Sequence, residues 1–350
     1  MGIETAFKNV VAAVGSEDRM EPITLSIRSF RQDWIERLLP FLPLSTRGNL
    51  RYVVGTRPLY GPRRLDAVWS HLDLPLLPWM LTRNLFAGVP VVLATDSTPR
   101  QLRAFAGHYE NWGGRSDRKF QLRERLYAAC LGRATAVQAW SEWAAGSLRD
   151  DYGVPASRIH VLPPGVDTGF WSPRPRQEDA SLPRILFVGG DFQRKGGDLL
   201  LDVFRKRFAD RAELHLVTRN GAVAAERGVH LHGGFAPNDP GLPELYRRCD
   251  VLAIPTHADC FSMAGLEAMA CGLPVVTCPV GGVAELFSEG REGHFIPPGD
   301  GRALAAALDP LLVDGERRQR LGGAARALVL RRYDARVNTR RLLELIESVC

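Results

Sequence analysis

The sequence has no long apolar run and no pair of cysteines at metal-ligand spacing. In 350 residues, no stretch approaches the roughly 18 uninterrupted apolar residues of a membrane-spanning helix. The opening residues Met1-Gly-Ile-Glu-Thr5 lack the basic and apolar regions of a secretory signal. The six cysteines include no C-x-x-C pair, which favours free thiols in a reducing compartment. These absences predict a cytoplasmic protein that holds no structural metal and no bound cofactor.

The composition is that of a globular protein with more than one domain. Apolar residues make up 45% and charged residues 24% of the chain. At 350 residues the chain is too long for a single compact core. All of the net charge of +6 falls in residues 1–165, with 21 Lys and Arg against 15 Asp and Glu. This basic surface, which includes residues 116–131, is either an ordinary solvated face or a contact for an anionic membrane surface or acceptor. No segment has the pattern of a nucleic-acid-binding module, so we expect no nucleic-acid partner.

Apolar runs and amphipathic segments alternate along the chain, which favours an α/β fold with parallel sheets. We expect strands at 23–27, 52–54, 65–69, 90–94, 134–140, 159–162, 184–190, 214–218, 229–231, 251–254, 275–280 and 294–296. We expect helices at 2–13, 34–42, 100–132 in two pieces, 141–152, 198–208 with an N-cap at Asp198 or a neighbour, and 262–272. The last part of the chain is expected to be helical, with a break at 331–334.

The turn residues divide the chain into two domains. Prolines and a polar run predict a linker at 166–182, between a first domain at 1–165 and a second at 183–330. We expect the C-terminal helix, 331–350, to pack back on the first domain. No strand precedes the helix at 2–13 in this sequence, so one interpretation is that the start is truncated or misplaced.

One β-α-β unit, residues 250–280, gathers polar residues at the end of an apolar strand. Its helix is expected to start near Ser262 and to stop at Gly272, a good C-terminal cap followed by a proline. The N–H groups at its start attract an anion. Glu267 lies among apolar neighbours, where an unpaired charge costs several kcal/mol, so we expect it to have a hydroxyl or cationic partner.

The second domain has two further places suited to phosphate. Gly189 and Gly190 let the backbone approach a ligand closely, and Arg194 and Lys195 can neutralise a diphosphate. The range 281–282 is a second glycine pair. Each feature alone is equally compatible with a tight turn or with surface charge.

Together these motifs resemble the family four retaining glycosyltransferases. Asp259-x7-Glu267 is similar to the E-x7-E region of that family, and the resemblance runs from about residue 134 to 335. The other matching motifs are Pro164-Gly-Val-Asp167, Arg194-Lys-Gly196, Leu231-His-Gly-Gly-Phe235, Gly281-Gly-Val-Ala-Glu285 and Gly293-His-Phe-Ile-Pro-Pro-Gly-Asp300. The resemblance implies the GT-B architecture, in which two Rossmann-like doubly wound domains face each other across a cleft.

The resemblance also implies roles for individual residues. Glu267 corresponds to the carboxylate that binds the nucleotide ribose, and Lys195 to the lysine on the diphosphate. Asp259 replaces a glutamate that contacts the donor sugar, with a reach shorter by ~1.5 Å. The usual arginine position falls on Gly190, so Arg194 is expected to supply that charge. The expected backbone contacts to the donor come from Gly189, Gly190, Phe261, Ser262, Met263, Gly281 and Gly282.

The first domain departs further from the family. Asp96 occupies the place of a histidine that many members carry after a strand. It is expected either to orient an acceptor hydroxyl and stabilise positive charge at the anomeric carbon or simply to cap the turn at Ser97 and Thr98. His71 is a second candidate, with plain packing as its alternative. The expected catalytic set is therefore Asp96, Asp259, Arg194 and Lys195.

The function implied is a metal-independent hexosyltransferase of class EC 2.4 that works with retention. The donor would be a UDP- or GDP-type sugar and the acceptor a hydroxyl, in polysaccharide or glycolipid biosynthesis in the cytoplasm or at the inner membrane face. The alternative is a nucleotide-sugar-binding protein of the same fold that has lost catalysis. A dinucleotide-dependent oxidoreductase is disfavoured, because no G-x-G-x-x-G follows a strand with an acidic residue ~20 positions later.

Overall fold

The computed structural model describes residues 2–14, 66–71, 88–109, 117–174, 182–218, 226–236 and 238–350. These residues form two compact units. The larger unit takes Met1–Ser16 and Pro163–Arg340, and the smaller takes Glu17–Leu162 and Arg341–Cys350. The strands expected at 23–27 and 52–54 and the helix at 34–42 lie outside the described residues.

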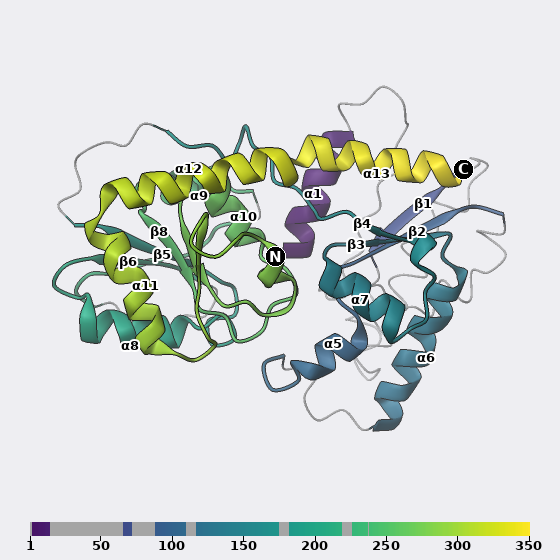
Figure 1. The fold of residues 1–350 in the computed structure, drawn as a ribbon, viewed down its shortest axis with the longest axis horizontal. Helices are drawn as coiled ribbons and strands as arrows, with labels where there is room; N and C mark the ends of the chain where they lie inside the picture. The colour runs from purple at the N-terminus through teal and green to yellow at the C-terminus, as the bar shows by residue number, and fades with distance from the viewer. Residues whose placement is uncertain are drawn as a thin grey trace, which may run out of the picture. The chain divides into compact units, whose positions relative to one another are not determined.

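The larger unit contains a parallel six-stranded sheet (Figure 1). Its strands are β5 (Arg184–Val188), β6 (Glu213–Val217), β7 (Val229–His232), β8 (Val251–Ile254), β9 (Val275–Thr277) and β10 (Gly293–Phe295). They follow the order β10-β9-β8-β5-β6-β7, so β5 lies at the point where the order reverses. In such sheets ligands bind outside the carboxyl ends of the strands at this switch point.

Helices cover both faces of this sheet. They are α8 (Gly197–Arg207), α9 (Gly241–Arg248), α10 (Met263–Ala270), α11 (Gly301–Val313) and α12 (Gly315–Arg332), with a short 3-10 helix η3 at Gly281–Glu285. Helices α8 and α11 lie on one side of the sheet, and α10 and α12 lie on the other (Figure 1). Asp300 and Asp314 cap α11 and α12 by accepting backbone N–H groups. Helix α9 was not among the expected elements.

The N-terminal helix α1 (Gly2–Val14) forms as expected but groups with the larger unit, where it packs against α10. The apolar stripe of this helix, which includes Phe7 and Val10, does not coincide with its buried face, because these two residues stay partly exposed while Ala6 and Asn9 are buried. The Asn9 amide donates to the Gly165 carbonyl at 2.8 Å. A polar side chain therefore anchors this helix.

The smaller unit contains a parallel sheet in the order β1-β2-β3-β4. Its strands are β1 (Val68–His71), β2 (Val91–Thr95), β3 (Ala136–Ala139) and β4 (Ile159–Val161). Its helices are α5 (Pro99–Ala104), α6 (Asp117–Arg133), α7 (Glu142–Asp150) and the 3-10 helix η2 (Ala156–Arg158). One core joins β2 and β3 to α6 and α7, and the expected N-cap of α7, Ser141, accepts from the Ala144 N–H.

The last helix, α13 (Ala335–Val349), starts after the break that the sequence predicted at 331–334. Its final residues group with the smaller unit, where Leu345 packs with Val92 and Ala136. This contact covers the face of the four-stranded sheet opposite α6 and α7. Among the described residues, no helix is both long and apolar enough to cross a membrane.

Candidate functional site

The turn between β5 and α8 carries Arg194 and Lys195 and is fixed by close packing. Gly196 has φ +74°, and a Cβ there would lie 2.1 Å from the carbonyl oxygen of Pro255, at the end of β8. Gly189 is similarly tight, since a Cβ would lie 2.9 Å from the Phe187 ring. The expected N-cap of α8 was Asp198 or a neighbour, and the structure has it two residues before Asp198, at Gly196. This turn needs glycine at position 196 because the segment that follows β8 touches it there.

Arg194 joins this turn to the segment that follows β8. Its Nη1 donates to the Ala258 carbonyl at 2.7 Å, and its Nε donates to Asp191 Oδ2 at 3.2 Å. Its own carbonyl accepts the His257 N–H at 2.9 Å. One guanidinium N–H and the Arg194 carbonyl therefore link the turn to this segment, and the bond to Asp191 fixes the side chain within its own turn.

Lys195 and Asp259 form an ion pair at the carboxyl ends of β5 and β8. Asp259 is 6% exposed, and Arg194 Nη1 lies 4.0 Å from its Oδ1. A buried carboxylate is stable only with such partners. The structure thus brings together two residues that the sequence assigned separately, one to the diphosphate and one to the donor sugar.

Helix α10 begins beside this pair. The sequence predicted a helix start near Ser262, and the structure has Ser262 as the N-cap, whose hydroxyl accepts the Gly265 N–H at 3.2 Å. Phe261 and Met263 are buried on either side of the cap. The helix N-terminus carries a partial positive charge, and it adds to Arg194 and Lys195 at the same sheet edge.

Glu267 is buried within α10 and accepts a hydrogen bond from the Tyr246 hydroxyl at 2.9 Å. The expectation that it has a hydroxyl partner is confirmed, and the partner comes from α9. Burial raises the pKa of Glu267 to about 8, and the hydrogen bond from Tyr246 only partly offsets this rise. The side chain is therefore largely protonated at neutral pH in the ligand-free protein.

The glycine pair at 281–282 forms the start of η3. Gly281 has φ +55°, and the Gly282 N–H donates to the Cys260 carbonyl at 3.0 Å. This bond links η3 to the segment before α10. Gly281 and Gly282 thus shape the loop beside the Lys195–Asp259 pair.

Asp96 and His71 lie in the smaller unit, at the ends of neighbouring strands. His71 pairs in register with Ala94, two residues before Asp96. The Ser97 hydroxyl donates to Asp96 Oδ1 at 2.9 Å, whereas the following helix is capped by Thr98. The His71 ring packs edge-on against the Trp140 ring, with 5.2 Å between the ring centroids. The other predicted site residues all lie in the larger unit.

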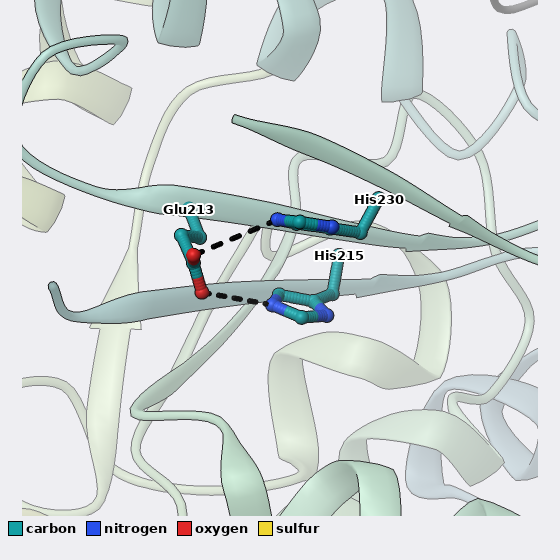
Figure 2. A group of neighbouring side chains, drawn as sticks. All are labelled: Glu213, His215 and His230. Carbon is teal, nitrogen blue, oxygen red and sulfur yellow. Dashed lines mark ion pairs between the residues drawn. The ribbon is translucent and has the colours of Figure 1, made fainter. Parts of the chain in front are cut away.

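A second cluster of ionisable side chains, which the sequence reasoning missed, lies on β6 and β7. Glu213, His215 and His230 point toward one another from the two strands (Figure 2). Their ligand atoms all lie within 4.8 Å of one another. The signal was present as Glu-x-His at 213–215 and His-x-His at 230–232, where alternate residues of adjacent strands share one face.

Comparison with known proteins agrees with the motifs. A family model described as "Glycosyltransferase Family 4" matches residues 10–170, and one described as "Glycosyl transferases group 1" matches 182–314. A D-inositol 3-phosphate glycosyltransferase of Xylanimonas cellulosilytica is 33% identical over 204 residues, which are 50% of this chain and 48% of that protein. The same enzyme of Thermobispora bispora is 28% identical over 81% of this chain and 71% of that protein.

Solved structures share the fold. A sucrose-phosphate synthase from Thermosynechococcus elongatus has a TM-score of 0.76 at 20% identity, covering 97% of this chain and 91% of that one. The Anabaena protein HepE in complex with UDP-glucose has a TM-score of 0.67 at 20% identity, covering 88% of this chain and 84% of that one.

The two family models and the two parallel sheets place the chain in a defined class. It belongs to the family 4, group 1 glycosyltransferases and has a GT-B fold. The match spans 48% and 50% of the lengths of the first two curated relatives.

Proposed function

We propose that this chain transfers a sugar from a nucleoside diphosphate sugar to an acceptor hydroxyl, with retention of configuration. The observation that carries the proposal is the convergence of Lys195, Arg194 and the α10 N-terminus at the carboxyl ends of β5 and β8. This is the place where doubly wound sheets bind nucleotides. The three positive groups suit a leaving diphosphate, and family membership supports the same assignment.

The donor contacts follow from this placement. Lys195 and Arg194 stabilise the charge that develops on the diphosphate when the bond to the anomeric carbon breaks. Backbone N–H groups near Ser262 and Met263 bind phosphate oxygens, and Glu267 accepts from the ribose hydroxyls. We propose a UDP-type donor, supported by the UDP-glucose complex of the similar Anabaena protein; a GDP-type donor is the alternative.

Charge from the protein replaces charge from a metal ion in this proposal. Diphosphate departure then continues after treatment with a chelator. Asp96 orients the acceptor hydroxyl, or stabilises positive charge at the anomeric carbon, from its position after β2. The acceptor class we propose is a polysaccharide or glycolipid hydroxyl, reached in the cytoplasm or at the inner membrane face through the basic first domain.

A second candidate function is nucleotide-sugar binding without catalysis. It is favoured by the Lys195–Asp259 ion pair, because a lysine that stays on Asp259 does not neutralise the leaving group. Asp259, which is shorter than the usual glutamate, and Gly190, which stands at the usual arginine position, also favour this second function.

A donor panel separates these functions. The chain is incubated with UDP- and GDP-sugars, with and without hydroxyl acceptors, and released nucleoside diphosphate is measured. Release that depends on both Lys195 and Glu267 supports transfer. Binding of a sugar nucleotide without release supports the second function, and release that survives Lys195→Ala and Glu267→Ala contradicts the assigned site.

A further inference from the structure

The cluster on β6 and β7 is organised by strand register. His215 lies directly opposite His230 in the parallel pairing, and Glu213 precedes His215 by two residues. The intervening Leu214 and Leu216 are buried on the opposite face of the sheet. The cluster therefore occupies one face near the edge of the sheet, away from the turns that hold Lys195 and Asp259.

The separations match those of ligands around one small ion. Glu213 Oε2 lies 3.6 Å from His215 Nε2, and Glu213 Oε1 lies 3.7 Å from His230 Nε2 (Figure 2). Ligands bound tetrahedrally to zinc at about 2.0–2.1 Å lie about 3.3 Å apart. The His215 and His230 rings stack with their centroids 4.7 Å apart, so rotation of the imidazoles is needed to bring the three ligand atoms, which lie within 4.8 Å of one another, onto a common centre. A fourth position is then left for water.

His215 presents its Nε2 to Glu213 Oε2 at 3.6 Å, too far for a hydrogen bond. Among the described residues this buried nitrogen has no hydrogen-bond partner, which is an unfavourable state for a polar atom. The His215 Nδ1 lies 2.9 Å from His232 Nε2. When the Nδ1–H donates to His232, the Nε2 lone pair is directed at the cluster, which is the tautomer that a metal ligand requires.

The remaining partners hold Glu213 in place. Arg184 Nε donates to Glu213 Oε2 at 2.9 Å, as outer-shell groups do for ligating carboxylates. The His230 side chain is 46% exposed, which gives an ion access from solvent.

We propose that Glu213, His215 and His230 form a binding site for a divalent zinc ion. Two imidazole nitrogens and one carboxylate oxygen are a ligand set that zinc favours. The ion ties the edge strand β7 to β6, so its role is to stabilise this part of the sheet. The site is independent of donor binding.

The test is a calorimetric titration in which zinc chloride is added to the metal-depleted full chain. The unsubstituted chain is expected to bind one equivalent. His230→Ala and Glu213→Gln should each weaken binding at least about tenfold, because each removes or neutralises a ligand. His108→Ala, which removes an exposed histidine of the smaller unit, is the matched control and should bind as tightly as the unsubstituted chain.

Two further readouts support or overturn the proposal. Zinc should raise the unfolding midpoint of the unsubstituted chain and of His108→Ala, but not of His230→Ala. Cobalt should give the visible absorption of a tetrahedral N/O site only where zinc binds. Absence of saturable zinc binding, or equal affinity in His230→Ala, would overturn the site. Release of nucleoside diphosphate should be the same with and without zinc.

Discussion

Two groups of ionisable side chains on the six-stranded sheet are built in different ways. Lys195 and Asp259 come from turns, 64 residues apart, that are pressed together at the ends of β5 and β8. Glu213, His215 and His230 stand on the strands themselves and are placed by their pairing register. The first group depends on close backbone packing, whereas the second depends only on sheet formation.

The difference shows how the same sheet can carry a ligand site and a structural site. The turn site holds a buried ion pair and a buried carboxyl group with raised pKa, both of which a nucleotide could reorganise. The strand site presents ligand atoms from backbone positions that the strand register fixes, so an ion needs only side-chain rotation. We therefore expect substitutions at the two places to change different properties.

The largest effect is expected from filling the turn. Gly196→Ala places a methyl group against the Pro255 carbonyl and strains a residue at φ +74°. It should lower the free energy of unfolding by about 4 kcal/mol or more. Gly299→Ala is the control, since φ is +77° there but the nearest atom is 4.0 Å away, and it should cost only about 1–2 kcal/mol. If chemical denaturation shows the same loss of unfolding free energy in both variants, the Gly196 turn is not in close contact with Pro255.

Removal of the lysine charge should have the next largest effect. Lys195→Ala is expected to lower kcat/KM for donor turnover by about 10²–10³, as for loss of one group that stabilises a developing negative charge. Lys206→Ala is the matched control, because Lys206 is exposed on α8, the helix that follows the Lys195 turn, and pairs with Asp202. A similar loss in both variants would contradict a specific role for Lys195.

The buried Glu267 predicts a pH-dependent stability. Its pKa is about 8 in the folded chain against 4.5 for an ordinary glutamate, so the folded state binds more protons between these values. Stability therefore falls as the pH rises through this window. Glu267→Gln keeps an acceptor for Tyr246 without the charge, so at pH 8 its melting temperature should exceed that of the unsubstituted chain by roughly 5 °C.

The same comparison at about pH 5 is the internal control, since Glu267 is then protonated in the folded state. The two melting temperatures should nearly coincide there. A constant difference at both pH values would mean that the effect comes from packing. Above pH 8, where Glu267 is mostly ionised, the variant should also bind nucleotide more weakly, because ribose hydroxyls donate better to a carboxylate than to an amide.

The smallest effect is expected from lengthening Asp259. Asp259→Glu extends the carboxylate by ~1.5 Å and should change the ratio of kcat/KM between two sugar donors by a few fold. Asp259→Asn, which keeps the size but loses the charge that holds Lys195, should reduce turnover of both donors alike. Unchanged donor preference in Asp259→Glu would remove this residue from the sugar contacts.

The sequence predicted the local structure of the donor side well. The apolar runs placed β5, β8 and β9, and the start of α10 near Ser262 was predicted from the sequence. Burial of Glu267 among alanines and leucine also predicted a polar partner. These features depend on neighbours in the sequence, which periodicity and capping rules describe.

The contacts that sequence reasoning missed are long-range. Tyr246 lies on α9, whose short pattern around Pro243 gave no clear helix signal. The pairing of His215 with His230 needs the register of two strands, and the Lys195–Asp259 pair needs the order of the whole sheet. The buried face of α1 was set by Asn9 and its bond to Gly165, against the apolar stripe.

A calorimetric titration with UDP tests most directly whether the cluster at the ends of β5 and β8 is the nucleotide site. The account predicts that UDP binds the unsubstituted chain and that Lys195→Ala weakens binding by about tenfold or more, the loss of one charge-assisted hydrogen bond. It predicts that His230→Ala, in the strand cluster, binds UDP as tightly as the unsubstituted chain. Equal UDP affinity in Lys195→Ala, or an equal loss in His230→Ala, would contradict the account.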